Sequence, residues 1–126
     1  MSEVSFALCK HCGNLVGLIN NAGVPLVCCG EKMQVLLANT VEASNEKHIP
    51  VIKLDNNKVR IEVGSVLHPM IPEHLIEWVY IQTSRGGHRK SLKAGEEPVL
   101  ESSLLDEELV AAYAYCNLHG LWKATV

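Results

Sequence analysis

The sequence predicts an all-β protein that consists of a small, metal-stapled domain followed by a larger β-sandwich. Two observations support this prediction. Four of the five cysteines lie within the first 29 residues, and regular alternation of apolar and polar residues begins only after that segment. We therefore expect residues 1–37 to form the first domain and residues 38–126 to form the second.

The first domain is expected to contain two short strands. Apolar runs at residues 14–19 and 24–27 flank the turn residues 20–23, as in a short hairpin. Domains below about 40 residues bury too little surface to be stable alone, and they usually need a metal, disulfides or a partner subunit. The cysteines supply this staple, so we expect the domain to be unfolded without metal.

The second domain is expected to be a series of short strands. In residues 58–63, Val59, Ile61 and Val63 alternate with charged residues, which is typical of a half-buried strand. Residues 103–109 could make two helical turns. Further strands are expected at 51–54, 76–84, 98–101, 109–115 and 121–126, with turns at 55–57 and 85–88. Six or seven short strands with Gly, Asn and Pro turns indicate an immunoglobulin-like β-sandwich.

Composition and charge exclude several classes of partner. Apolar residues make up 48% of the chain, which is typical of a folded globular protein. The formal net charge of −3 makes nucleic acid and anionic membranes poor candidate partners. No apolar run approaches the roughly 20 residues of a membrane span, and the N-terminus lacks a signal-peptide pattern. We expect a soluble, cytoplasmic protein, in which clustered cysteines favour metal binding over disulfides.

The first candidate metal site consists of two cysteine pairs. Cys9 and Cys12 have the C-x2-C spacing that lets both sulfurs reach one ion. Cys28 and Cys29 are adjacent, so they can share that ion only if the backbone bends, which Gly30 makes easier. A set of four sulfurs suits either zinc or iron, so a structural zinc ribbon stays open at this point.

The second candidate site combines one cysteine with four histidines, His48, His68, His74, Cys116 and His119. Structural zinc sites close at four ligands, so five nitrogen and sulfur donors are too many for one. Such a set, with one position left free, indicates a redox metal such as iron acting on a small ligand. The other two histidines, His11 and His88, are expected to face solvent and not to bind metal.

The motifs C-x2-C and CC, together with EKHIP, HPM, EH and CNLHG, resemble the desulfoferrodoxin family, the two-iron class of superoxide reductases. The resemblance covers essentially the whole chain and implies two Fe ions per chain. It implies an Fe(SCys)4 centre in a desulforedoxin-like first domain, held by Cys9, Cys12, Cys28 and Cys29. It also implies a second, catalytic iron with His48, His68, His74 and His119 as equatorial ligands and Cys116 as axial ligand.

The resemblance implies an enzyme of oxidative-stress defence, a superoxide reductase. It would reduce superoxide by one electron to hydrogen peroxide at the ferrous His4Cys site, as a homodimer supplied by a rubredoxin-type electron donor. Lys47 is expected to attract the superoxide anion and to order a proton-donating water. Glu46 resembles the family's carboxylate that occupies the vacant position in the ferric state. An ordinary solvated Glu–Lys pair is the alternative for these two residues.

Three other functions stay open from the sequence. A rubredoxin-like electron-transfer protein without catalytic activity would use the four N-terminal cysteines but leave the second candidate site unexplained. A binding module with two structural zinc ions would be colourless, whereas ferric thiolate sites absorb visible light. A superoxide dismutase would work without a reductant.

Overall fold

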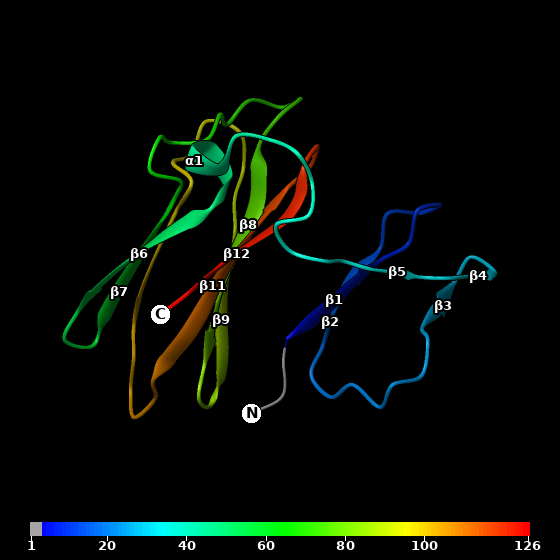
Figure 1. The fold of residues 1–126 in the computed structure, drawn as a ribbon, viewed down its shortest axis with the longest axis horizontal. Helices are drawn as coiled ribbons and strands as arrows, with labels where there is room; N and C mark the ends of the chain where they lie inside the picture. The colour runs from blue at the N-terminus through cyan, green and yellow to red at the C-terminus, as the bar shows by residue number, and fades with distance from the viewer. Residues whose placement is uncertain (1–3) are drawn as a thin grey trace. The chain divides into compact units, whose positions relative to one another are not determined.

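The computed structural model describes residues 4–126, and the chain divides into two compact units, Met1–Leu37 and Ala38–Val126. Strands dominate both units (Figure 1). The described residues contain a single helix, the four-residue α1 (Asn45–His48). The predicted all-β fold class is therefore confirmed. Within residues 4–126, no helix is both long and apolar enough to cross a membrane.

The first unit contains two small antiparallel sheets. In the larger sheet, β1 (Ser5–Leu8) lies between β2 (Leu15–Leu18) and β5 (Gln34–Val35). In the smaller sheet, β3 (Val27–Cys28) pairs with β4 (Glu31–Lys32). β1 and β2 lie directly before and after the segment that carries Cys9 and Cys12. β3 and β4 flank the turn at Cys29 and Gly30, so the two sheets fix the backbone on both sides of each cysteine pair.

The pairing predicted for this unit is wrong, although the strand at 14–19 is confirmed. The run at 24–27 is a strand only at its last residue, and β2 and β3 pair with β1 and β4 rather than with each other. β1, the central strand of its sheet, carries the buried Phe6 and Ala7 but is not predicted from the sequence. A four-residue strand is too short to show a periodic pattern.

The second unit is a sandwich of two antiparallel sheets with strand orders β10-β7-β6 and β12-β11-β8-β9. Apolar side chains of both sheets, such as Ile61, Ile81 and Ala112, are fully buried between them. The strands are β6 (Pro50–Asp55), β7 (Lys58–Val63), β8 (Ile76–Thr83), β9 (Gly86–Ser91), β10 (Val99–Ser103), β11 (Leu109–Cys116) and β12 (Gly120–Thr125). Six of these correspond to strands that the sequence predicts.

The seventh strand, β9, replaces most of the turn predicted at residues 85–88. A Cβ atom on Gly87 would overlap the hydroxyl of Tyr80 on the neighbouring β8. Glycine in this position therefore marks a close approach between two strands and not a chain reversal. The reversal itself occupies only Ser84 and Arg85.

The helix considered at residues 103–109 does not form. Ser103 still belongs to β10 and lies opposite Lys58 in the sheet. Asp106 has a φ of 53°, a left-handed conformation that cannot continue an α-helix. Leu104 and Leu109 are both buried in the core, which fixes the two ends of this irregular connection.

The helix α1 lies at one end of the sandwich, the end at which the β7–β8 connection also runs (Figure 1). Hydrogen bonds join the two segments, since the Glu46 carbonyl accepts from the Val66 N–H at 2.9 Å and the Ser65 hydroxyl at 3.2 Å. A Cβ atom on Gly64 would lie 2.5 Å from the same carbonyl oxygen. Gly64 therefore permits the close approach that places α1 beside the loop.

Candidate metal centres

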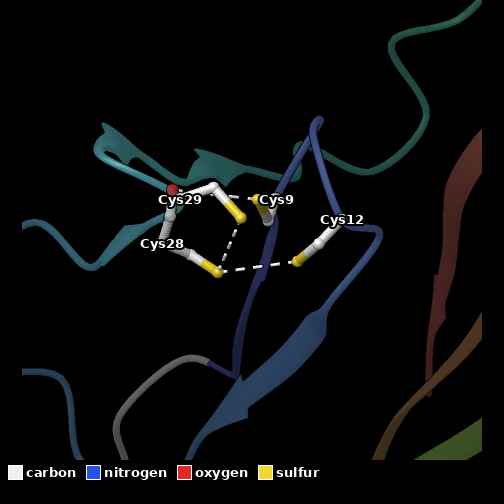
Figure 2. Close-up of side chains that lie close together, drawn as sticks. All are labelled: Cys9, Cys12, Cys28 and Cys29. Atoms are coloured by element: carbon white, nitrogen blue, oxygen red, sulfur yellow. Dashed lines mark hydrogen bonds between the residues drawn. The ribbon is translucent and has the colours of Figure 1, made fainter.

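The tetracysteine group consists of Cys9, Cys12, Cys28 and Cys29, whose sulfur atoms all lie within 4.8 Å of one another. Figure 2 shows the four side chains converging from two separate parts of the first unit. The Cys12 and Cys28 sulfurs are 3.6 Å apart, and the Cys28 and Cys29 sulfurs are 4.0 Å apart. All four are free cysteines. Disulfide sulfurs would be only about 2.05 Å apart, so the group is not a pair of crosslinks.

A tight turn allows the adjacent Cys28 and Cys29 to point at the same place. Cys28 ends β3, and the two-residue connection to β4 consists of Cys29 and Gly30. Both have positive φ, 53° and 75°, as the mirror-image hairpin turn of type I′ requires. The backbone bend that the sequence analysis expects at this pair is therefore present.

The sulfur positions fit one tetrahedral ion. Metal–sulfur bonds of about 2.3 Å at tetrahedral angles put neighbouring sulfurs about 3.8 Å apart. The two measured separations, 3.6 Å and 4.0 Å, lie on either side of this value. A tetrahedral set of four sulfurs suits zinc or iron, and it is fully supplied by this chain.

The protonation equilibria of the group also favour a bound cation. The backbone N–H of Cys12 bonds the Cys9 sulfur and lowers the pKa of that thiol to about 6. Side-chain hydrogen bonds to Cys12 and Cys9 raise the pKa of Cys29 to about 12. The Cys9 thiolate forms readily, whereas the raised pKa values of Cys28 and Cys29 oppose their ionisation beside it. A metal ion removes this obstacle because it neutralises the charge and deprotonates the coordinating thiols.

The histidine–cysteine group consists of His48, His68, His74, Cys116 and His119 in the second unit. His48 ends α1, Cys116 ends β11, and the other three lie in connections next to β7, β8 and β12. One ligand atom each from His48, His68, His74 and Cys116 lie within 4.8 Å of one another. His119 joins them through Nδ1, which is 3.1 Å from His48 Nε2 and 3.8 Å from the Cys116 sulfur.

The four imidazole rings surround one point. Neighbouring rings in the cycle His48, His68, His74, His119 have centroids 4.5–5.1 Å apart and are nearly perpendicular, at 79–82°. His48 and His74 face each other across the cycle at 6.2 Å. Two nitrogen–nitrogen sides measure 3.1 Å. A square of this side has corners about 2.2 Å from its centre, close to the metal–nitrogen bond length of about 2.0–2.1 Å.

Hydrogen bonds to backbone carbonyls leave the facing nitrogens without protons. His48 Nδ1 lies 2.7 Å from the Ser44 carbonyl, and His68 Nδ1 lies 2.7 Å from the Pro69 carbonyl. Because a carbonyl only accepts, each Nδ1 carries the hydrogen, and a neutral ring then presents a lone pair at Nε2. The two Nε2 atoms are 3.1 Å apart. Two lone pairs at this distance repel each other unless a cation lies between them.

Burial opposes the alternative, which is protonation of the rings. It lowers the pKa of His48 and His74, and it lowers the pKa of His68 to about 4. His74 Nε2 is also buried without a hydrogen-bond partner among the described residues. Neutral rings with unsatisfied lone pairs directed at a common point are typical of a metal site.

The Cys116 sulfur completes the donor set, close to the ring nitrogens of His68 and His119. It is fully buried and lies 3.4 Å from His68 Nε2. Burial raises the pKa of the Cys116 thiol, whereas hydrogen bonds from the backbone N–H groups of Leu118 and His119 lower it. The same two N–H groups would stabilise a thiolate bound to a cation.

Glu46 and Lys47 are both exposed on α1. After burial, the positive charge of Lys47 is a further cause of the lowered pKa values of His48 and His74, so it acts on the histidine–cysteine group. Both side chains belong to the short helix whose last residue is the buried His48.

The two histidines expected to face solvent differ from each other. His11 is largely exposed and pairs with Glu31 at 3.1 Å, as a surface residue would. His88 is half-buried, with Nδ1 2.6 Å from the Ser102 hydroxyl and Nε2 3.2 Å from the Glu107 carboxylate. The prediction of a solvated His88 is wrong, because the residue belongs to β9 and not to a turn.

Trp122 supports the histidine–cysteine group, although the sequence motifs do not predict this role. Its ring lies 4.8 Å from the His48 ring, and its Nε1–H donates to the His119 carbonyl at 3.2 Å. The signal that could have found it is its place at the end of the CNLHGLW segment. Backbone carbonyls such as those of Ser44 and Pro69 leave no comparable signal in a sequence.

Comparison with known proteins gives a consistent answer. The family model described as Desulfoferrodoxin matches residues 40–125. The chain is 44% identical to a desulfoferrodoxin homolog from Archaeoglobus fulgidus, over 92% of each chain. It is 43% identical to the desulfoferrodoxin of Nitratidesulfovibrio vulgaris, over 92% of this chain and 91% of the relative.

A solved structure also matches both units. The superoxide reductase from Treponema pallidum has a TM-score of 0.83 and 38% identity, over 98% of this chain and 100% of that one. The superoxide reductase (1Fe-SOR) from Giardia intestinalis covers 64% of this chain and 97% of its own, with a TM-score of 0.55 and 30% identity. With the two cysteine and histidine groups in place, the chain belongs to the desulfoferrodoxin family.

Proposed function

We propose that this protein is a superoxide reductase, which reduces superoxide by one electron to hydrogen peroxide. The observation that carries this proposal is the histidine–cysteine group. Its neutral imidazoles direct lone pairs at one point, and its single thiol is fully buried beside them. The relatives named superoxide reductase support the same reaction.

Iron is the metal that fits this group and this reaction. His48, His68, His74 and His119 would hold it through ring nitrogens, and Cys116 would hold it through sulfur. Bound ferrous iron supplies the single electron and an open coordination position, whereas zinc has no redox chemistry. Four neutral rings and one thiolate give the donor set only one negative charge, which leaves the site attractive to an anion when the metal is bound.

The protein's own residues supply the electrostatics and the protons. Lys47 attracts superoxide against the net charge of −3 and holds a water that delivers one of the two protons that the reaction consumes. The Leu118 and His119 N–H groups offset part of the effect of burial, which raises the pKa of the Cys116 thiol, and they would stabilise its thiolate once a cation is bound. Glu46 would supply a carboxylate to the bound iron, which requires its exposed side chain to turn inward.

The tetracysteine group would hold a second iron, so each chain carries two. Its sulfur separations and the turn at Cys29 support this assignment. Since the reaction consumes one electron per superoxide, an external donor is required, and a rubredoxin-type protein suits the role. Five free cysteines are typical of a reducing compartment and support a cytoplasmic location.

We also infer that the protein is a homodimer. The first unit exposes several large apolar side chains, among them Ile19, Val24 and Leu37, and its sheet ends in two edge strands, β2 and β5. Apolar groups and open strand edges on so small a unit favour pairing with a second copy.

The proposed reaction is tested with iron-loaded, fully reduced protein under anaerobic conditions. A pulse of superoxide should yield one hydrogen peroxide for each superoxide consumed, with no release of dioxygen. Without a reductant, consumption should stop once the electrons of the two ferrous ions are spent, at no more than two superoxides per chain, and a reductant should restore it.

Zinc-loaded protein is the control, because the same fold then lacks a redox-active ion. Continued consumption without reductant, accompanied by dioxygen, would instead identify a dismutase. If superoxide is not consumed at all while the iron sites cycle with a reductant, the protein is an electron carrier.

A further inference from the structure

Asn117 ties together two segments that carry members of the histidine–cysteine group. Its side-chain amide donates to the Glu73 carbonyl at 3.0 Å and accepts from the Leu75 N–H at 3.0 Å. Its backbone N–H donates to the Leu75 carbonyl at 3.2 Å. These three bonds hold the residues immediately before and after His74 against the residue that follows Cys116.

His74 depends on such support more than His48 and His68 do. The rings of His48 and His68 are each oriented by a bond from Nδ1 to a backbone carbonyl. Among the described residues, His74 makes no comparable ring hydrogen bond, and its Nε2 is buried without a partner. Its backbone is fixed inside its own loop by two bonds with Ile71, both 3.1 Å long. The loop as a whole is fixed by Asn117.

We propose that Asn117 is a positioning residue that sets the place of the His74 ring relative to Cys116, and thereby the metal affinity of the histidine–cysteine group. This inference rests on the proposed function only in assuming that the group binds a metal. Groups behind the ligands commonly change metal affinity by about 10–100-fold when they are replaced. For His74 the supporting group is an amide that bridges two loops and not a partner of the ring itself.

The chemistry of the bridge requires an amide. One planar group must donate on one side and accept on the other, and both partners are backbone atoms that cannot adapt. In Asn117→Asp the acceptor is kept, but a carboxylate oxygen meets the Glu73 carbonyl in place of the N–H. The two oxygens repel, so the His74 loop should move away from Cys116.

Asn39 offers a matched control in the same unit. Its amide donates to the Lys123 carbonyl at 3.0 Å and accepts from the Lys123 N–H at 2.9 Å, and its backbone N–H donates to the Leu121 carbonyl at 3.0 Å. Asn39→Asp therefore breaks the same kind of bridge. It does so in a segment that contributes no member of the histidine–cysteine group.

The experiment measures Co²⁺ binding to the full-length wild-type protein and to both variants by competition with a chelator, followed in the visible spectrum. We expect Asn117→Asp to bind Co²⁺ at the histidine–cysteine group about 10–100-fold more weakly, with altered sulfur-to-cobalt charge transfer from Cys116. Binding at the tetracysteine group should not change, which makes it an internal reference. Asn39→Asp should bind at both groups as the wild type does.

Equal affinity and an equal spectrum in Asn117→Asp and the wild type would overturn the proposal. A wild-type protein that binds Co²⁺ only at the tetracysteine group would contradict the proposed function instead. If Asn117→Asp lacks native near-ultraviolet circular dichroism, Asn117→Ala, which removes both side-chain bonds without adding charge, is measured with the same expectation. If neither variant folds while Asn39→Asp does, Asn117 serves folding and the proposal fails.

Discussion

Lys47 is a positively charged side chain on the exposed face of α1, next to His48 in the sequence. It follows the exposed Glu46 and precedes the buried His48. One helical turn therefore contains two residues in solvent and one member of the histidine–cysteine group. Because the protein carries a net charge of −3, an incoming anion is repelled at long range. A single lysine next to His48 can make the local field attractive to an anion.

Replacement of Lys47 by alanine should slow the reaction with superoxide about tenfold at low salt and flatten its dependence on ionic strength. The measurement is the second-order rate constant by pulse radiolysis between about 10 mM and 500 mM salt. Lys58→Ala removes an equal charge from an exposed position in β7 and should leave the rate within a factor of about two. An unchanged rate in Lys47→Ala at low salt would remove Lys47 from the mechanism.

At the scale of single residues, the family motifs predict all nine cysteines and histidines that the structure brings together in two groups. They do not predict which ring nitrogen faces the common point. His48 and His68 present Nε2 because carbonyls hold their Nδ1, whereas His119 presents Nδ1. The deciding atoms belong to the backbone, and any residue type could supply them.

Two edge strands from opposite sheets are joined by side chains near His88. His88 on β9 contacts Ser102 on β10, and its other ring nitrogen contacts Glu107 in the connection to β11. A hydrogen bond from the Thr83 side chain lowers the pKa of Glu107, followed by bonds from His88 and the Leu105 N–H. The carboxylate thus links β8 and β9 to the connection between β10 and β11.

Glu107→Gln should destabilise the metal-free protein at pH 7, and the difference from the wild type should vanish in acid. A carboxyl whose pKa is lowered by folding stabilises the folded state above its ordinary pKa of 4.5. This contribution is lost as the pH falls through the lowered value, because the folded protein must then take up the proton as well. The measurement is urea-induced unfolding of both proteins at several pH values from 7 to 3.

The exposed neighbour Glu108 provides the control, and Glu108→Gln should follow the wild-type curve at every pH. A stability difference for Glu107→Gln that stays constant with pH would show that packing, and not the charge, is responsible.

At the scale of elements, strands with a one-sided pattern were predictable and their partners were not. β7 alternates buried and partly exposed residues, so its sequence predicts it. β1 pairs with β5 although the two are separated by the whole tetracysteine segment, and no local pattern reports such a contact. The sequence pattern does not predict β9, because Gly87 serves the packing of Tyr80 rather than a turn.

The two units are stabilised in different ways. The second unit buries a continuous apolar core between two sheets. The first unit has few buried apolar residues, and Cys9 is one of them, so its metal ligands also form part of its interior. Domains of this size depend on such a staple, and structural metal ions contribute about 10–16 kcal/mol in comparable small domains.

Removal of metal by a strong chelator should unfold the first unit and leave the second folded. Limited proteolysis should then cleave within residues 1–37, while the fragment that contains residues 38–126 resists digestion. Sedimentation should show conversion of a dimer to a monomer. The exposed apolar residues Ile19, Val24 and Leu37 are then no longer held in place by a folded unit. Reloading with Zn²⁺ should restore both properties, because the tetracysteine group needs only a tetrahedral ion.

A first unit that resists protease without metal would contradict this account of its stability. A monomer with metal bound would contradict the homodimer and leave the account of stability intact.

The contact between Trp122 and His48 gives the protein a built-in optical reporter. An indole ring 4.8 Å from a ligand ring lies within range for its excited state to be quenched by an open-shell ion, and its Nε1–H is tied to His119. The fluorescence of Trp122 should therefore decrease when iron or cobalt binds at the histidine–cysteine group, and it should persist when zinc binds there. Trp78, stacked on Tyr115 at 5.7 Å, is the second indole, and Trp122→Phe would separate the two signals.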